Sequence, residues 1–324
     1  MLVESVPNVS EGRRLDVVER LVDALTSVPG VYLLDRTSDP SHNRSVFTVA
    51  GEHDAVADGL DRLVAAAIDE IDMDEQQGEH PRIGAVDVVP FVPLGDTTLD
   101  DCVELARTFG RRIAARYQLP VYLYAAAASR SDRVKRADVR RGQYEGLKVE
   151  IAHNGRQPDF GPARMHPRAG ATAVGARPFL IAWNINLDSE DVELAKRIAR
   201  RVRESGGGLP RLQANGFRVE EPERGHPMRA QVSMNLLDFR ATPLWRAWEA
   251  VGELAAEDGV ALAESELIGL APLAALLDVA DHADVPAGQP LEARLAAAAD
   301  AIRLRDFDPL MALELRLADA RGRT

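Results

Sequence analysis

The residues with the most chemical potential stand in one short stretch, Gly78 to Asp87, which runs from a polar turn into an apolar segment of strand character. The turn carries the imidazole of His80 between Glu79 and Arg82. Imidazole both accepts and donates a proton near neutral pH, and a rigid strand fixes the base of a loop that bears functional groups. The stretch therefore predicts either acid–base chemistry at His80 or an idle histidine in an exposed turn.

Three other polar segments leave two interpretations open. Asn8 and Ser10 follow the first predicted strand, where they either contact a ligand or cap the next helix. Asn43 and Arg44 either bind a carboxylate or form a surface turn. The glycines between residues 161 and 175 match neither a phosphate loop nor a dinucleotide fingerprint, so they indicate either close backbone approach to a ligand or a flexible linker.

Other kinds of catalysis find little support in the sequence. His153, His166, His226 and His282 are scattered without the spacing of metal ligands, so we expect no metal site. Cys102 lies on the apolar face of a predicted helix and is expected in the core, and no nucleophile-elbow motif occurs. The expected chemistry is proton transfer with electrostatic positioning.

Length and composition indicate a globular protein of two domains. The chain has 324 residues, of which 46% are hydrophobic and 28% charged, and no apolar run is long enough to span a bilayer. The N-terminus has the pattern of a first strand rather than of a leader. A single cysteine fits a reducing compartment, so we expect a cytoplasmic protein without membrane partners.

The charge distribution bears on partners. The net charge of −12 argues against nucleic-acid binding through a basic face. Nearly all the positive charge is arginine, because lysine occurs only at Lys135, Lys148 and Lys196. Arginine binds carboxylates with a bidentate fork, which would suit an acidic small molecule. A genome rich in arginine codons would give the same bias, and composition leaves both explanations open.

The elements that must position these residues occur in two similar runs. Apolar periodicity predicts strands and helices in the order β-α-β-β-α-β between Leu2 and Pro93, followed by a helix at 99–117 and a strand at 120–125. A long segment at 152–175 is predicted as a loop. The same order returns between Phe179 and Glu266, with helices expected over 272–283 and in the tail at 291–320. We expect an α+β fold of two ferredoxin-like subdomains arising by duplication, 1–178 and 179–324, with a helical C-terminal extension.

Several motifs together resemble the glutamate formiminotransferase family, the transferase half of the bifunctional formiminotransferase-cyclodeaminase. The likeness covers nearly the whole chain, in order and at matching spacing. The motifs that carry it are Ser5 to Gly12, Asn43-Arg44, Gly78-Glu79-His80-Pro81-Arg82, Tyr122-Leu123-Tyr124, Pro158 to Pro162, Gly170 to Arg177, Asn184 to Leu187, Gln231 to Leu237 and Ile268 to Leu270.

The resemblance implies an activity and a set of site residues. The family transfers the formimino group of N-formimino-L-glutamate to N5 of tetrahydrofolate, releasing glutamate, in histidine breakdown, and is usually homodimeric. His80 matches its acid–base histidine, which would carry both proton transfers. Because both substrates carry carboxylates, the resemblance implies substrate contacts from Asn8, Asn43, Arg44, Glu79, Arg82 and Arg177. The matching folate segment is Gly161, Pro162, Ala163, Arg164, Met165, His166, Pro167, Arg168, Ala169 and Gly170.

The chain departs from the family pattern at a few positions. Ala169 stands where the family usually has tryptophan, Arg164, Met165 and His166 replace smaller or apolar residues, and Pro178 replaces a basic residue. Loss of an aromatic ring would weaken stacking on a pterin. Two alternatives to the formimino transfer stay open, which are a formyltransferase that uses N-formylglutamate or 5-formyltetrahydrofolate, and a folate-binding protein without turnover.

Overall fold

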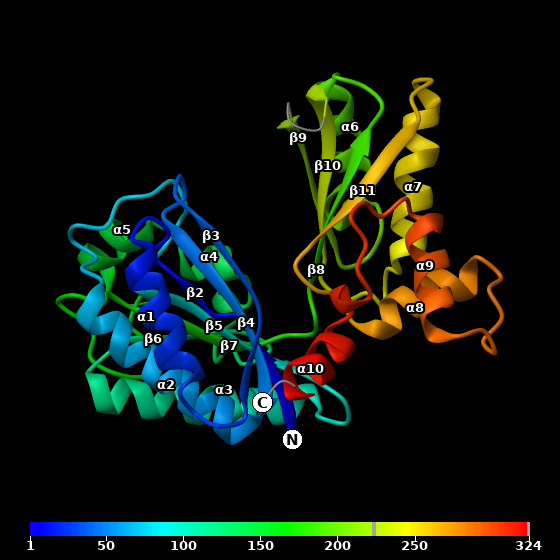
Figure 1. Ribbon diagram of the computed structural model, residues 1–324. Coiled ribbons are helices and arrows are strands. Elements are labelled where there is room, and N and C mark those ends of the chain that lie inside the picture. Colours follow the sequence, from blue (N-terminus) through cyan, green and yellow to red (C-terminus); the bar gives the residue numbers. More distant parts are fainter. Residues whose placement is uncertain (154, 222–224, 323–324) are drawn as a thin grey trace. The chain divides into compact units, whose positions relative to one another are not determined.

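A computed structural model describes residues 1–153, 155–221 and 225–322 (Figure 1). The chain divides into two compact units, Met1–Pro178 and Phe179–Thr324. Both contain helices and one β-sheet, so the mixed α+β class expected from the sequence is confirmed. Among the described residues, no helix combines the length and the apolar character needed to cross a membrane.

The first unit contains thirteen elements in the described part of the chain. They are β1 (Leu2–Ser5), β2 (Asn8–Val9), α1 (Leu15–Thr26), β3 (Val31–Asp39), β4 (Arg44–Glu52), α2 (His53–Glu70), β5 (Val86–Pro93), α3 (Leu99–Tyr117), β6 (Val121–Ala125), a 3₁₀ turn (Ser131–Arg133), α4 (Arg136–Val139), α5 (Gln143–Glu150) and β7 (Thr172–Ala176).

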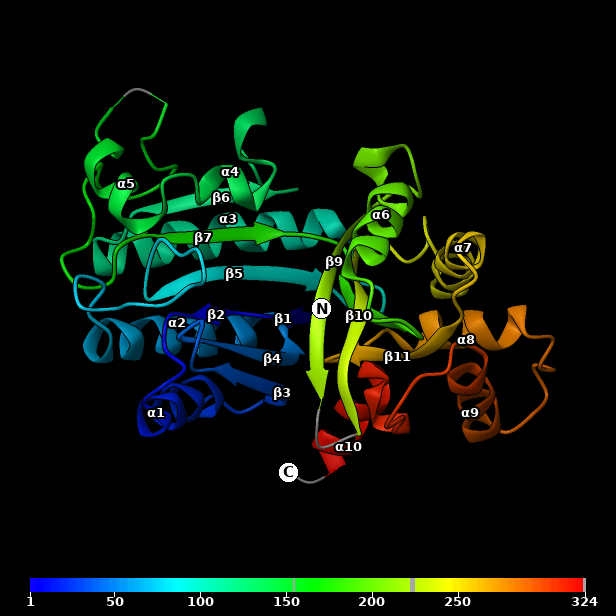
Figure 2. The ribbon, with the colours of Figure 1, turned by 90° about the horizontal axis from the view of Figure 1, so that it is seen from above.

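Strand pairing in this unit makes one twisted sheet. Strands β1 and β2 both lie between β4 and β5 with antiparallel pairing, and β3 pairs with the outer edge of β4. Strands β7 and β6 extend the sheet beyond β5 in parallel, and Figure 2 shows these three strands side by side. The helices α1, α2 and α3 bury their apolar stripes in one core cluster with the sheet. A smaller cluster on Val88, Tyr122 and Tyr124 packs against α4 and α5.

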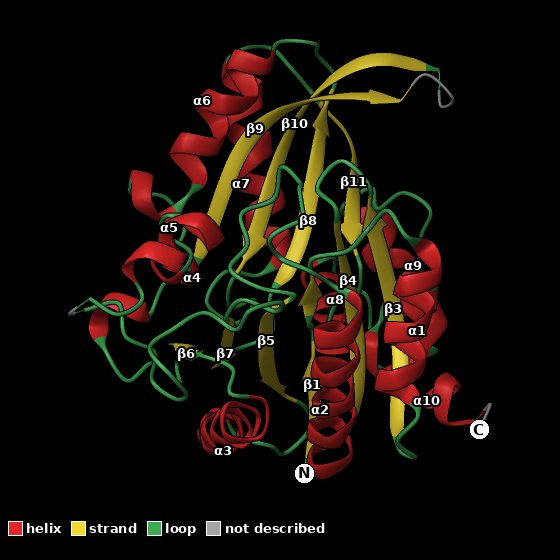
Figure 3. Ribbon diagram, turned by 90° about the vertical axis from the view of Figure 1, so that its left-hand side faces the viewer, coloured by secondary structure: helices red, strands yellow, loops and turns green. Residues whose placement is uncertain are grey.

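The second unit repeats the order of elements. Its elements are β8 (Ile181–Leu187), α6 (Val192–Val202), a 3₁₀ turn (Glu204–Gly206), β9 (Leu212–Glu221), β10 (His226–Leu236), α7 (Leu244–Glu257), β11 (Leu262–Ile268), α8 (Leu273–His282), α9 (Leu291–Ala301), a 3₁₀ turn (Pro309–Met311) and α10 (Leu313–Gly322). Its antiparallel sheet has the order β11-β8-β10-β9, seen as yellow arrows in Figure 3.

The two sheets share one strand order. If the strands of each βαββαβ run are numbered along the chain, with β1 and β2 as one interrupted strand, both sheets read 4-1-3-2. In the first unit these are β5, β1/β2, β4 and β3, and in the second β11, β8, β10 and β9. The repeated order of elements read from the sequence is therefore present in the structure.

One element was predicted wrongly. The loop expected to run to Gly175 ends before β7, which lies between β5 and β6. All five residues of β7 are buried, so they show no alternation of apolar and polar residues. Because they are also small, the segment has the composition of a loop although it is a central strand.

Candidate active site

His80 lies in the turn that leads from α2 to β5, and its side chain is half-buried. The ring of His42 meets it edge-on, with 6.1 Å between the ring centroids. The pKa of His80 is lowered to about 3. Burial is the main cause, and the positive charges of Arg44, Arg140 and Arg136 contribute to the same shift. The imidazole is therefore neutral at physiological pH and has an unprotonated ring nitrogen, although the lowered pKa makes it a weak base.

Arg44, the first residue of β4, is held in place by Asn8. Its Nε donates a hydrogen bond of 2.8 Å to Asn8 Oδ1, and Nη2 donates to the same oxygen. Burial, followed by the charges of Arg140 and Arg136, lowers the pKa of Arg44 to about 10. The guanidinium keeps its proton at neutral pH, although it has lost much of its hydration and is paired with a neutral amide.

Arg140 forms an ion pair with Asp87 in which both side chains are buried. Asp87 Oδ1 also accepts a 2.8 Å hydrogen bond from the backbone N–H of Ile83, three residues after His80. The carboxylate therefore connects the end of α4 to the turn that carries His80. The Nε of Arg140 is buried without a hydrogen-bond partner among the described residues.

Two further arginines complete a positively charged region. Arg136 is solvent-exposed, yet partial desolvation and the neighbouring Arg140 lower its pKa, and its guanidinium makes no hydrogen bond or ion pair with another described residue. Arg177 lies close to Arg136 and to the buried hydroxyl of Tyr124, whose pKa is raised by burial. We call this set the His80 cluster; it comprises His80, Arg44, Asp87, Tyr124, Arg136, Arg140 and Arg177.

Asn43 and Glu79 lie in the same turns but play different structural roles. Asn43 adopts a positive φ of 47°, accepts a hydrogen bond from Gly12 N at 3.0 Å and donates one to Gln77 O at 2.9 Å. It therefore joins three backbone segments near Arg44. The side chain of Glu79 is exposed, and its backbone N–H donates to Ser41 O.

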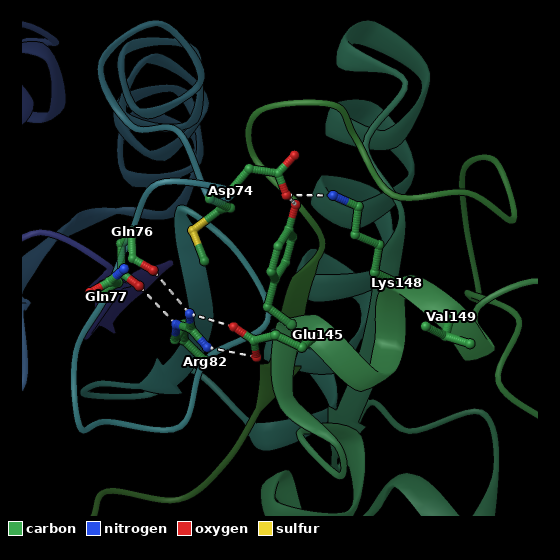
Figure 4. Close-up of a pocket in the computed structure, with 9 residues that line it drawn as sticks. Asp74, Gln76, Gln77, Arg82, Glu145, Lys148 and Val149 are labelled. Atoms are coloured by element: carbon green, nitrogen blue, oxygen red, sulfur yellow. Dashed lines mark hydrogen bonds and ion pairs between the residues drawn. The ribbon is translucent and has the colours of Figure 1, made fainter.

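Arg82 belongs to a separate pocket of about 350 Å³, drawn in Figure 4. Its guanidinium is buried and donates to both carboxylate oxygens of Glu145, at 3.0 and 2.8 Å. It also donates to the side chain and the backbone oxygen of Gln76. Asp74 in the same pocket accepts hydrogen bonds from Tyr144 and Lys148. We call this region the Arg82 pocket; its lining is Met73, Asp74, Gln76, Gln77, Arg82, Tyr144, Glu145, Lys148 and Val149.

The segment 161–170 forms a compact loop against the start of β5. Backbone hydrogen bonds join His166 and Gly170 in both directions, and His166 Nδ1 accepts from the backbone N–H groups of Arg168 and Ala169. The ring proton of His166 therefore sits on Nε2. Gly170 has a φ of 70°, and a Cβ there would lie 2.5 Å from Ile83 O. This glycine is required by the close approach of two backbone segments.

The structure thus brings this loop next to the turn of His80. Ala85 N donates to Ala169 O at 2.9 Å, and Ala171 N donates to Ile83 O at 3.0 Å. The side chain of Ala169 is buried in the core of the first unit, so the departure from tryptophan falls at a packed position. The exposed part of the loop is 161–168, where Pro162, Met165 and His166 remain partly buried.

Part of the His80 cluster is absent from the site residues expected from the sequence. Asp87, Tyr124, Arg136 and Arg140 were given no role, although Arg136 and Arg140 stand four residues apart in a strongly basic segment. That spacing places two side chains on one face of a helix, which was the available signal. In the described part of the chain, no three His, Cys, Asp or Glu side chains gather as metal ligands would.

Comparisons with known proteins cover both units. Residues 2–177 match the family model of the formiminotransferase domain, N-terminal subdomain, and residues 182–285 match that of the formiminotransferase domain. The glutamate formimidoyltransferase of Streptococcus pyogenes is 43% identical over 87% of this chain and 92% of its own length. That of Thermoplasma acidophilum is 46% identical over 87% and 91%. The formimidoyltransferase-cyclodeaminase of Rattus norvegicus is 43% identical over 86% of this chain, which matches 52% of that longer protein.

Proposed function

Because the chain belongs to the formiminotransferase family, we propose that it is a glutamate formimidoyltransferase. It transfers the formimino group of N-formimino-L-glutamate to N5 of tetrahydrofolate, which gives 5-formiminotetrahydrofolate and L-glutamate, as in histidine degradation. The structural observation that carries this proposal is a half-buried imidazole, His80, near arginines that outnumber their carboxylate partners among the described residues. Such a site suits proton transfer on an acidic substrate.

Tetrahydrofolate supplies the nucleophile, the nitrogen N5. A bond forms between N5 and the formimino carbon while the bond from that carbon to the glutamate nitrogen breaks. One proton leaves N5, and one must reach the departing nitrogen, so the two transfers balance. Neutral His80 accepts the first proton and returns it to the second nitrogen. The charges of Arg44 and Arg140 favour prompt return of the proton, because they disfavour the imidazolium.

The proposed substrate contacts are supported by the positions and hydrogen bonds of the residues. Arg44 and Arg177 contact carboxylates directly, Asn8 orients Arg44, and Asn43 holds the adjoining turns. Glu79 and Arg82 flank His80; for Arg82 to bind a substrate carboxylate, its guanidinium must exchange Glu145 for the substrate.

The loop 161–170 is proposed to hold the folate, since its backbone is joined to Ile83 and Ala85 at the base of the His80 turn. Its exposed part, with Met165 and the guanidinium of Arg164, offers apolar and charged surface for a pterin that carries a glutamyl tail. Ala169 and Gly170 keep the loop in place from the core side.

Assembly and location are part of the same proposal. The family resemblance supports two ferredoxin-like subdomains, 1–178 and 179–324, in each chain of a homodimer. Cys102 is buried and unpaired, which supports a reducing, cytoplasmic compartment. Light scattering on a size-exclusion column tests the dimer, because a monomeric mass at micromolar concentration would contradict it.

The activity is tested by mixing the purified protein with tetrahydrofolate and either formiminoglutamate or formylglutamate. Glutamate release and the absorbance of the folate product report turnover. We expect turnover with formiminoglutamate. Turnover with formylglutamate alone would replace the proposal by a formyltransferase, and tight folate binding without turnover would leave a binding protein.

A further inference from the structure

We propose that Arg140 and Arg136 receive the α-carboxylate of the amino-acid donor, and that Asp87 is the positioning residue that aims Arg140 at it. The inference rests on the proposed function and assigns a donor subsite within it. It adds two arginines from the α4 region to the contacts that the family resemblance implies, and it gives the buried Asp87 a purpose.

The His80 cluster carries more positive than negative charge, which favours the binding of an anion. The cluster holds four guanidinium groups, those of Arg44, Arg136, Arg140 and Arg177, but one carboxylate, that of Asp87, which is paired with Arg140. The next carboxylate, Asp39, already accepts hydrogen bonds from the backbone N–H groups of Ser41 and His42. Gathering like charges in a partly desolvated region is costly unless a counter-charge compensates them. Within the described chain that counter-charge is incomplete, so an anionic ligand is the natural partner.

Hydrogen-bonding capacity indicates which arginines contact the ligand. Arg140 uses Nη2 on Asp87, while its buried Nε has no partner among the described residues. Arg136 makes no side-chain hydrogen bond to a described residue and is open to solvent. Arg44, in contrast, has both Nε and Nη2 on Asn8. Unpaired N–H groups therefore remain on Arg140 and Arg136, and also on Arg177, whose Nη1 donates to Pro178 O.

The covalent structures of the two substrates indicate which carboxylate binds to Arg140 and Arg136. In N-formiminoglutamate, the carbon that bears the α-carboxylate also bears the nitrogen that His80 must protonate. In tetrahydrofolate, the glutamyl carboxylates are separated from N5 by the methylene bridge and the aminobenzoyl ring. A cation cluster around the acid–base imidazole therefore lies within reach of the donor's α-carboxylate and far from the carboxylates of the folate.

Binding of the amino-acid donor would also raise the pKa of His80. The charged groups that face His80 come from β4 (Arg44), from the turn before it (His42) and from the α4 region (Arg136 and Arg140). A carboxylate placed on Arg140 and Arg136 offsets two of these charges. His80 then becomes more basic when the donor is bound, which prepares it to take the proton from N5.

Steady-state kinetics test the subsite with four variants. R140Q and R136Q remove the proposed contacts, and R140K keeps the charge without the planar fork. R112Q is the matched control, since Arg112 lies on α3 of the same unit and pairs with Asp58. We expect KM for formiminoglutamate to rise roughly 10- to 100-fold in R140Q and less in R140K and R136Q, with KM for tetrahydrofolate within about 2-fold of wild type. An unchanged donor KM in R140Q, or an equal rise in both KM values, would overturn the subsite.

A second measurement needs no turnover. The imidazole resonances of His80, assigned with His80→Gln, are titrated with pH by NMR in the presence of L-glutamate or of 4-aminobutyrate, which lacks the α-carboxylate. L-Glutamate should raise the titration midpoint of His80 by roughly one pH unit in wild type and by less in R140Q, and 4-aminobutyrate should leave it unchanged. Equal effects of the two ligands, or none with saturating L-glutamate, would reject the inference. Absence of turnover in wild type would reject only the proposed function, and this titration would still decide the subsite.

Discussion

His80 and Arg82 are two residues apart, yet they belong to regions of opposite electrostatic character. In the Arg82 pocket every charge has a partner, because Arg82 is paired with Glu145 and Lys148 with Asp74. In the described part of the His80 cluster, by contrast, Arg140 is the one arginine of four that is ion-paired with a carboxylate, that of Asp87. A cavity of about 350 Å³ lies at the balanced region, and the uncompensated charge lies at the other.

The difference shows why the number of arginines does not identify a binding site. A guanidinium that is already hydrogen-bonded on several sides, as Arg82 is, must break those bonds before it can bind a ligand. A guanidinium with unpaired N–H groups can bind a ligand without first breaking hydrogen bonds to other residues. We therefore expect substitutions in the His80 cluster to change catalysis and those in the Arg82 pocket to change mainly the local structure.

The largest contrast is expected at His80 itself. His80→Ala removes the group that carries both protons, so kcat should fall by roughly 10²- to 10⁴-fold. Folate binding, followed by quenching of protein fluorescence, should remain within about 2-fold of wild type, because the loop 161–170 is held by backbone hydrogen bonds that do not involve His80. A variant that keeps more than a tenth of the wild-type kcat would remove the imidazole from the mechanism.

The next prediction compares one carboxylate from each region. Asp87→Asn leaves Arg140 buried without its counter-charge and should lower the free energy of unfolding by about 3 kcal/mol or more. Glu145→Gln removes a carboxylate that is 63% exposed, so water replaces much of the interaction and the loss should stay near 1 kcal/mol or less. Urea unfolding followed by circular dichroism measures both. Equal losses in the two variants would mean that burial does not distinguish the regions.

The effect expected at Arg82 is smaller, and it decides whether Arg82 contacts a substrate carboxylate. Arg82→Ala should raise KM for the acidic substrates by only about 2- to 5-fold, since its guanidinium is already bonded to Glu145 and Gln76. Glu145→Gln serves as the sharper variant, because it frees part of the guanidinium. If Arg82 binds a substrate carboxylate, Glu145→Gln should lower KM, whereas unchanged KM values for both substrates in both variants would rule out direct contact.

Much of this architecture could be predicted from the sequence, because the relevant signals are local. The periodicity of Leu15 to Leu25 and of the strand around Val88 identifies elements whose one-sided or complete burial is recorded in residue type. The His80 turn was found because a histidine between charged residues stands just before a buried strand. By contrast, β7 consists of small residues that pack between β5 and β6, and only the tertiary structure shows it to be a strand.

The electrostatic difference between the two regions could not be predicted, because it depends on contacts distant in the sequence. Arg82 and Glu145 are 63 positions apart, and Asp87 and Arg140 are 53 apart. No periodicity links such pairs, so Arg82 appeared as a substrate contact on the same grounds as Arg44. Which arginine is engaged and which has free donors became visible only when the chain brought α4, α5 and the His80 turn together.

The smallest expected effect concerns stability in acid. The folded-state pKa of His80, about 3, lies below its ordinary value of 6.5, so the unfolded chain binds the proton first as the pH falls. The contribution of His80 to stability is therefore complete above pH 6.5 and is lost progressively between pH 6.5 and about 3. The pKa of His166 is lowered as well. This residue is present both in wild type and in the variant His80→Gln, so its contribution cancels when the two proteins are compared.

His80→Gln isolates this contribution, because glutamine fills similar space without titrating. Between pH 7.5 and 4.5, the urea midpoint of wild type should fall slightly more than that of His80→Gln, and the difference should shrink when L-glutamate is present at both pH values. Partial exposure of the ring to water keeps the effect modest. Identical slopes in the two proteins would mean that neither burial nor the surrounding arginines lower the pKa of His80 in solution, and the two regions would then differ in geometry alone.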